Sequence, residues 1–149
     1  MSIYYGSGGN SGEGRIVQVK SVNLSSAFST TSSSFQDTGH KVSITPTDSG
    51  NKILVLAYAG VNNTSSGDGG YCTIYQSGSN ISPEGTVMAG YWQENNSNNV
   101  EQTAFMSMLH LPGTNTARTY EVRIKVVSGG TFYWGYRTNG CITAIEVTN

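Results

Sequence analysis

A nearly strict alternation of apolar and charged residues over residues 120–127 constrains the fold of this chain more than any other feature. Successive side chains of a β-strand point to opposite faces, so this stretch has one apolar face and one charged face. The apolar face consists of Tyr120, Val122, Ile124 and Val126, and the charged face of Glu121, Arg123 and Lys125. A strand that buries one face and exposes the other is typical of an antiparallel sheet.

Other stretches of the chain show strand patterns, and no stretch shows a comparable helical period. Strands are predicted for residues 16–22, 42–45, 52–61, 71–75, 86–92, 102–111, 131–134 and 142–147. Turn residues separate them at intervals of about 8–12 residues, which is typical of sandwiches and jelly rolls. The sequence therefore predicts an all-β, antiparallel β-sandwich that is jelly-roll-like and has about 8–10 strands.

Residues 52–61 form the most hydrophobic stretch, and it is apolar on both faces. Ile53, Val55, Ala57 and Ala59 share one face, and Leu54, Leu56 and Tyr58 share the other. We predict that this strand is central, with a second sheet on one face and a loop or a neighbouring subunit on the other.

A single domain is predicted over residues 15–149, which is long enough to bury a core without a metal or a disulfide. Residues 1–14 are rich in Gly, Ser and Asn and are expected to form a flexible arm. Its residues Ile3, Tyr4 and Tyr5 would become ordered on a partner surface. The chain shows neither the pattern of a signal peptide nor the roughly 20 apolar residues of a membrane span.

The composition argues against two classes of partner. Charged residues make up 11% of the chain, and its formal net charge is −1. Such a surface offers little attraction to a phosphate backbone or to an anionic membrane. We therefore expect no nucleic-acid partner and no membrane insertion.

Residues suited to catalysis or metal binding are sparse, and we predict no enzymatic activity, catalytic residue, metal or cofactor. His40 and His110 lie far apart in the sequence, and no Gly-x-Ser-x-Gly motif accompanies the many serines. Cys72 and Cys141 have no Cys or His at metal-ligand spacing. Both are expected to be small buried thiols, and a disulfide between them stays open as an alternative.

Aromatic residues concentrate in two segments and allow two interpretations. The candidate ligand-binding residues are Tyr91, Trp92, Tyr133, Trp134 and Tyr136, beside the amides of Asn95 and Asn96. Outward rings next to amides would suit stacking on a sugar and hydrogen bonding to its hydroxyls. The second interpretation, which we favour, is that the rings fill the core and a subunit interface.

Residues 102–111 alternate between two faces that are both largely apolar. Phe105, Leu109 and Leu111 share one face, and Met106, Met108 and His110 share the other. Together with residues 52–61 they give more apolar strand surface than one sandwich core needs. We predict that Met106, Met108 and His110 are interface residues that are buried between subunits.

A series of short motifs runs in order through most of residues 15–147. They are FSTTSSSF (residues 28–35), VSITP (42–46), KILV (52–55), GGY (69–71), PGT (112–114) leading into RTY (118–120), VSGGT (127–131) and ITAIEV (142–147). This ordered set resembles a module found at the ends of tailed-phage and prophage fibre or virion proteins.

The resemblance implies a jelly-roll-like sandwich that forms a homotrimer and has a virion-structural or receptor-binding role. A host-surface glycan is the partner that the aromatic residues would suit. Such modules usually follow a long fibre shaft, whereas here only residues 1–14 precede the domain. A knob or a decoration protein of the head or tail is therefore expected to fit better than a fibre tip.

The location that follows is the virion, after assembly in the host cytoplasm, with the arm bound to other virion proteins. A free carbohydrate-binding β-sandwich module is the alternative, and it rests on the aromatic residues.

Overall fold

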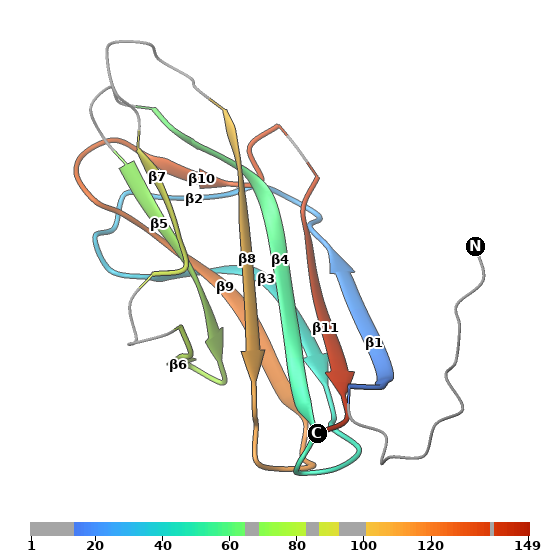
Figure 1. The fold of residues 1–149 in the computed structure, drawn as a ribbon. Helices are drawn as coiled ribbons and strands as arrows, with labels where there is room; N and C mark the ends of the chain where they lie inside the picture. Colours follow the sequence, from blue (N-terminus) through green and yellow to red (C-terminus); the bar gives the residue numbers. More distant parts are fainter. Residues whose placement is uncertain (1–13, 65–68, 83–86, 93–100, 138) are drawn as a thin grey trace.

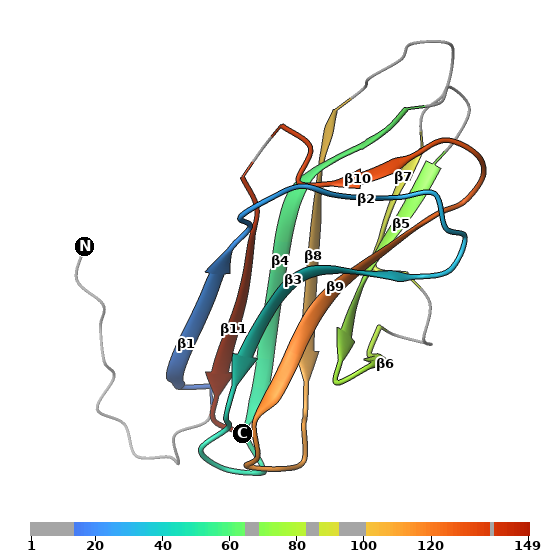
Figure 2. The same cartoon turned by 180° about the vertical axis from the view of Figure 1, so that it is seen from behind.

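The computed structural model describes residues 14–64, 69–82, 87–92, 101–137 and 139–149, except for the side chains of residues 91 and 92. This part of the chain contains eleven strands and no helix, and the strands form two antiparallel sheets. Figures 1 and 2 show the two layers from opposite sides. The predicted all-β antiparallel sandwich is therefore confirmed. Among the same residues there is accordingly no helix that could span a membrane.

The six-stranded sheet is built around β4 (Lys52–Asn63). Along one edge β4 pairs with β11 (Cys141–Val147) and β10 (Phe132–Trp134), and along the other edge with β8 (Gln102–His110). β1 (Ile16–Asn23) lies beyond β11, and β2 (Phe28–Thr30) lies beyond β10. The central position predicted for residues 52–61 is confirmed, because this stretch is hydrogen-bonded on both edges (Figure 1).

The five-stranded sheet is built around β9 (Arg118–Val126), which lies between β3 (Gln36–Ile44) and β5 (Gly69–Gln76). β7 (Ala89–Trp92) and β6 (Ser79–Asn80) pair with the two ends of β5. The strand number exceeds the expected 8–10 because β2 and β6, which have only three and two residues, were not predicted. Strands this short leave little pattern in a sequence.

The core lies between the sheets and takes one face from each long strand. In β9 Glu121 of the opposite face is also buried, and the core residues are those that the alternation predicts: Tyr120, Val122, Ile124 and Val126. In β4 they are Ile53, Val55, Ala57 and Ala59. Phe132 of β10 lies against Gly70 of β5, where an added Cβ would come within 2.3 Å of the ring. A glycine is therefore needed at residue 70 for the two sheets to approach this closely.

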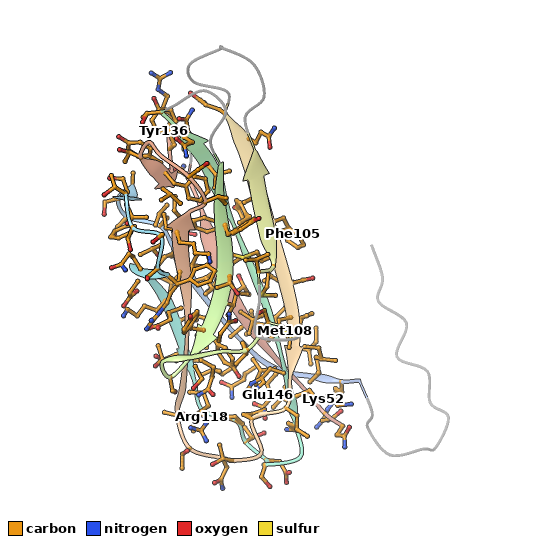
Figure 3. The ribbon with its side chains drawn as sticks, turned by 90° about the vertical axis from the view of Figure 1, so that its left-hand side faces the viewer. Lys52, Phe105, Met108, Arg118, Tyr136 and Glu146 are labelled. Carbon is orange, nitrogen blue, oxygen red and sulfur yellow. The ribbon has the colours of Figure 1, made fainter. Side chains whose placement is uncertain are left out.

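A buried carboxylate holds the loop between β3 and β4 against the end of the six-stranded sheet. Glu146 of β11 is fully buried and lies between the layers (Figure 3). Its Oε1 accepts hydrogen bonds from the backbone N–H of Thr47 at 2.7 Å and from Nδ2 of Asn51 at 2.7 Å. Its Oε2 accepts one from Nε2 of Gln18 at 2.6 Å. Neutral donors therefore compensate the buried charge, as buried polar groups require.

Only Gly14 of the arm predicted for residues 1–14 belongs to the described part of the chain. Its backbone N–H donates to the carbonyl of Thr148 at 3.0 Å, and the N–H of Thr148 donates to the carbonyl of Arg15 at 2.9 Å. The start of β1 is thereby fixed beside the end of β11. The expected flexibility of the arm and the docking of Ile3, Tyr4 and Tyr5 concern residues outside the described part.

Candidate functional site: the two outer faces of the sandwich

The outer face of the five-stranded sheet carries paired charges. Nε of Arg123 donates to Oε1 of Glu121 at 2.8 Å, and Nζ of Lys41 donates to Oδ2 of Asp37 at 2.6 Å. Partial burial by itself would raise the pKa of Asp37, but the hydrogen bonds from Lys41 and Gly39 hold it below its usual value. Asp37 and Lys41 are exposed, whereas Glu121 is largely covered and is paired with Arg123.

Aromatic rings on the same face lie under the cationic side chains. The guanidinium carbon of Arg123 is 4.2 Å from the ring centre of Tyr75, and Nζ of Lys125 is 4.8 Å from that of Phe35. Phe35 and Tyr75 are themselves 6.0 Å apart. Cation–π contacts of this kind cover the rings and leave the charged heads toward water.

The outer face of the six-stranded sheet has the opposite chemistry. Directly paired residues of an antiparallel ladder share a face, so the register of four strands defines its rows. The first row consists of Val19, Ile145, Leu54 and Leu109. The second row consists of Ser21, Thr143, Leu56 and Ser107. The third row consists of Asn23, Cys141, Tyr58 and Phe105. These twelve residues are called the outer apolar face below.

The outer apolar face contains no charged residue and exposes large hydrophobic side chains. The exposed fractions are 59% for Phe105, 53% for Leu109, 52% for Val19 and 44% for Tyr58. Phe105 projects from the outer side of β8 (Figure 3). The hydroxyls of Ser21 and Thr143 lie 2.9 Å apart, so the polar side chains at the centre bind one another. Contiguous exposed apolar surface of this kind marks interaction sites on proteins.

The structure places Met106, Met108 and His110, the predicted interface residues, on the inner side of β8. Met106 is a core residue with 1% exposure, and Met108 packs against the core. His110 is half-buried, and its Nδ1 lies 3.0 Å from the hydroxyl of Tyr120. The long side chain of Met106 stands opposite Ala57, whose small side chain leaves space on the inner face. The exposed residues are therefore Phe105 and Leu109.

The structure separates the aromatic candidates for ligand binding. Trp134 is fully buried, and its indole N–H donates to Nδ1 of His40 at 3.1 Å, so its ring is not available for stacking on a sugar. Tyr133 and Tyr136 are half-buried, with ring centres 5.2 Å apart in an edge-to-face contact. Tyr91 and Trp92 belong to β7, but their side chains lie outside the described part, as do Asn95 and Asn96.

Two shallow hollows lie on either side of residues 24–26, one toward Gly135 and Arg137 and the other toward His40. One, of about 230 Å³, is lined by residues that include Ser25, Gly135 and Arg137. The other, of about 300 Å³, is lined by residues that include Ser25, Thr38 and His40. Pockets for drug-sized ligands usually measure about 300–1,000 Å³, so both hollows are at or below the small end of that range.

The cysteines are not joined to each other. Cys72 is a fully buried free thiol of β5, where burial raises its pKa, and Cys141 is a half-buried free thiol on the outer apolar face. The disulfide that the sequence left open is therefore not formed. Among the described residues, no group of three His, Cys, Asp or Glu side chains is placed to hold a metal ion.

Comparison with known proteins assigns no family to this chain. No protein-family model matches it, and no curated protein matches it either. Its function therefore has to follow from its residues and from the surface chemistry of the sandwich.

Proposed function

We propose that this chain is a non-enzymatic structural or receptor-binding module of a phage virion, in the form of a fibre tip, a knob or a decoration protein. The observation that carries the proposal is the outer apolar face. A module that functions within an assembly needs one surface that faces water and another that contacts the neighbouring subunits. The charged face of β3, β9 and β5 suits the first role, and the outer apolar face suits the second.

The histidines support a structural role rather than a catalytic one. The chain has two, and both side chains are engaged in structural contacts. His40 lies between the indole of Trp134 and the carbonyl of Val22, and His110 contacts the hydroxyl of Tyr120. These contacts include no serine, cysteine or carboxylate, which are the usual neighbours of a catalytic histidine.

The ordered motifs over residues 15–147 add the viral context. They resemble a module of tailed-phage and prophage fibre or virion proteins. The homotrimer, the contact of the arm with other virion proteins and the virion location belong to this proposal.

Particle proteomics tests the proposal. Phage particles are purified on a density gradient from induced cells that carry the gene in its native context, and their proteins are measured by mass spectrometry. We expect peptides of this chain to co-sediment with the major capsid protein and to survive a high-salt wash. Detection in the cell lysate but not in the particle fraction would refute the virion role.

A carbohydrate-binding module is the second candidate, and the Tyr133–Tyr136 pair favours it. The guanidinium carbon of Arg137 is 5.1 Å from the ring centre of Tyr136, and Nη1 of Arg137 pairs with Glu101 at 3.1 Å. Half-buried rings beside charged and hydroxyl groups suit a sugar. On a glycan array, Tyr136→Ala should abolish any binding by the wild type, whereas Tyr71→Ala on β5 should not. A well-folded wild type that binds no glycan would refute this candidate.

A further inference from the structure

We infer that the outer apolar face is the contact surface between copies of this chain. The inference rests on the structural role proposed above and names the partner, which is a second copy of the same chain. It also corrects the side of β8 that the sequence favoured, because the contact is made by Phe105 and Leu109 rather than by Met106 and Met108.

The absence of charge from the outer apolar face favours a second copy over a charged partner. None of the twelve residues in its rows is acidic or basic, so a strongly acidic or basic surface would find no counter-charge there. A second copy presents the same apolar and hydroxyl side chains, and no like charges meet. The formal net charge of −1 adds almost no repulsion between copies.

The size of the face is sufficient for a specific contact. Leu111 and Ile16, which are 54% and 60% exposed, extend it at one end. Four strands about 4.8 Å apart and rows along about seven residues give a patch of about 20 Å by about 25 Å. Two such patches bury about 1,000 Å², which is the lower bound for a specific interface. Lys52, in the end row, lies at the margin, where its ammonium can stay in water.

The neighbouring sheet edge does not obstruct a second copy. Residues 102–110 of β8 contain no Lys, Arg, Asp, Glu or Pro, and among the described residues β8 pairs only with β4. Monomeric proteins usually protect a long edge strand with charges or proline. The opposite edge, β1, carries Lys20. An uncharged edge beside an uncharged face is expected where both are covered in the assembly.

Light scattering on the full chain tests the inference. At about 50 μM the wild type should have a multiple of the 15.8 kDa chain mass: twofold if two faces pack against each other, and threefold if the faces meet about a threefold axis. The double variant Phe105→Glu/Leu109→Glu should lower the mass to that of one chain, because the charges would be desolvated at the contact. Both side chains are more than half exposed in one chain, so the circular dichroism spectrum should be unchanged. The control Ser43→Glu, an exposed strand position on the other sheet, should keep the wild-type mass.

A second measurement needs no variant and covers the case in which the double variant fails to fold. Cys141 belongs to the outer apolar face, whereas Cys72 is fully buried. Alkylation of Cys141 in the wild type, followed by mass spectrometry, should be slow at high protein concentration and faster after dilution.

Two results would overturn the inference: a wild-type monomer at 50 μM with a labelling rate that does not depend on concentration, or a double variant that keeps the wild-type mass. In the first case, a chain that is still found in virions would show that the face binds another virion protein. The virion role is therefore refuted only by the particle experiment, and the light-scattering result does not affect it.

Discussion

The indole N–H of Trp134 donates a hydrogen bond to Nδ1 of His40 across 3.1 Å and thereby links the two sheets through the core. Trp134 belongs to β10 of the six-stranded sheet and His40 to β3 of the five-stranded sheet. Nε2 of His40 lies 3.1 Å from the carbonyl oxygen of Val22. Because Nδ1 accepts, the proton of the neutral imidazole is on Nε2, which donates to that carbonyl. A protonated imidazole would direct a second N–H toward the indole N–H.

Removing the imidazole should destabilise the fold. In His40→Ala the buried N–H of Trp134 loses its acceptor and the carbonyl of Val22 loses its donor. We expect the free energy of unfolding to fall by about 1–3 kcal/mol, as is usual for an unsatisfied buried polar group. Urea denaturation measures the change. Lys41→Ala, one residue further on and exposed, should cost less than about 1 kcal/mol. Equal effects of the two variants would contradict the role of the His40–Trp134 contact.

The stability of the domain should fall in mild acid. Burial lowers the pKa of both His40 and His110 below the ordinary value of 6.5. The unfolded chain therefore binds protons near pH 6.5 while the folded chain does not, so protonation favours unfolding. The free energy of unfolding should be constant above about pH 6.5 and should decrease below it. Thermal unfolding between pH 7.5 and 5 tests this, and His40→Ala should show a smaller decrease. A midpoint that does not vary with pH would exclude the effect.

The buried Glu146 should contribute stability at neutral pH that is lost in strong acid. Burial by itself would raise its pKa, but hydrogen bonds from Asn51, Gln18 and Thr47 bring the pKa down to about 2. The contribution is therefore present above pH 4.5 and is lost as the pH falls from 4.5 to about 2. The shift corresponds to about 3 kcal/mol at pH 7.

Glu146→Gln tests this contribution, because the new amide places an N–H₂ group opposite existing donors. The variant should lose about 2–4 kcal/mol at pH 7 and clearly less at pH 2.5, by urea denaturation at both pH values. The control is Glu101, whose carboxylate pairs with Arg137 at the surface. Glu101→Gln should lower the free energy of unfolding by less than about 1 kcal/mol. A loss in Glu146→Gln that is the same at both pH values would contradict the assignment.

The contact between Gly70 and Phe132 should not tolerate a methyl group. In Gly70→Ala the new Cβ would lie 2.3 Å from the ring, so the two sheets would have to separate locally. We expect a loss of about 1–3 kcal/mol from overpacking. Gly50→Ala is the control, because its Cβ would meet only a side-chain oxygen of Asp48 at 3.3 Å. A stable Gly70→Ala protein with an unchanged melting temperature would refute the close packing.

The long strands and their buried faces could be predicted from the sequence, because a period of two is a local property of the chain. The alternation over residues 120–127 identified the buried face of β9, and the two apolar faces of residues 52–61 identified a central strand. The short strands β2 and β6 were not predicted, because they are held by their partner strands rather than by a pattern of their own.

The candidate surface depended on information that is not local. The sequence showed that both faces of residues 102–111 are apolar, but alternation alone cannot tell which one turns inward. The tertiary structure decided this: Met106 is buried opposite Ala57, and Phe105 and Leu109 are exposed. The aromatic run behaves in the same way, since Trp134 is buried in the core with its indole N–H bound to His40 of a distant strand.

The sequence by itself determined that this chain is an all-β sandwich with a weakly charged surface and more apolar strand faces than one core can use. Only the tertiary structure decided that Phe105 and Leu109 form the exposed surplus and that Glu146 is satisfied by Gln18, Thr47 and Asn51. The physical reason is the distance along the sequence over which each property is determined. Strand period is fixed by neighbouring residues, whereas burial and hydrogen-bond partners are fixed by segments that meet only after the sheets have paired.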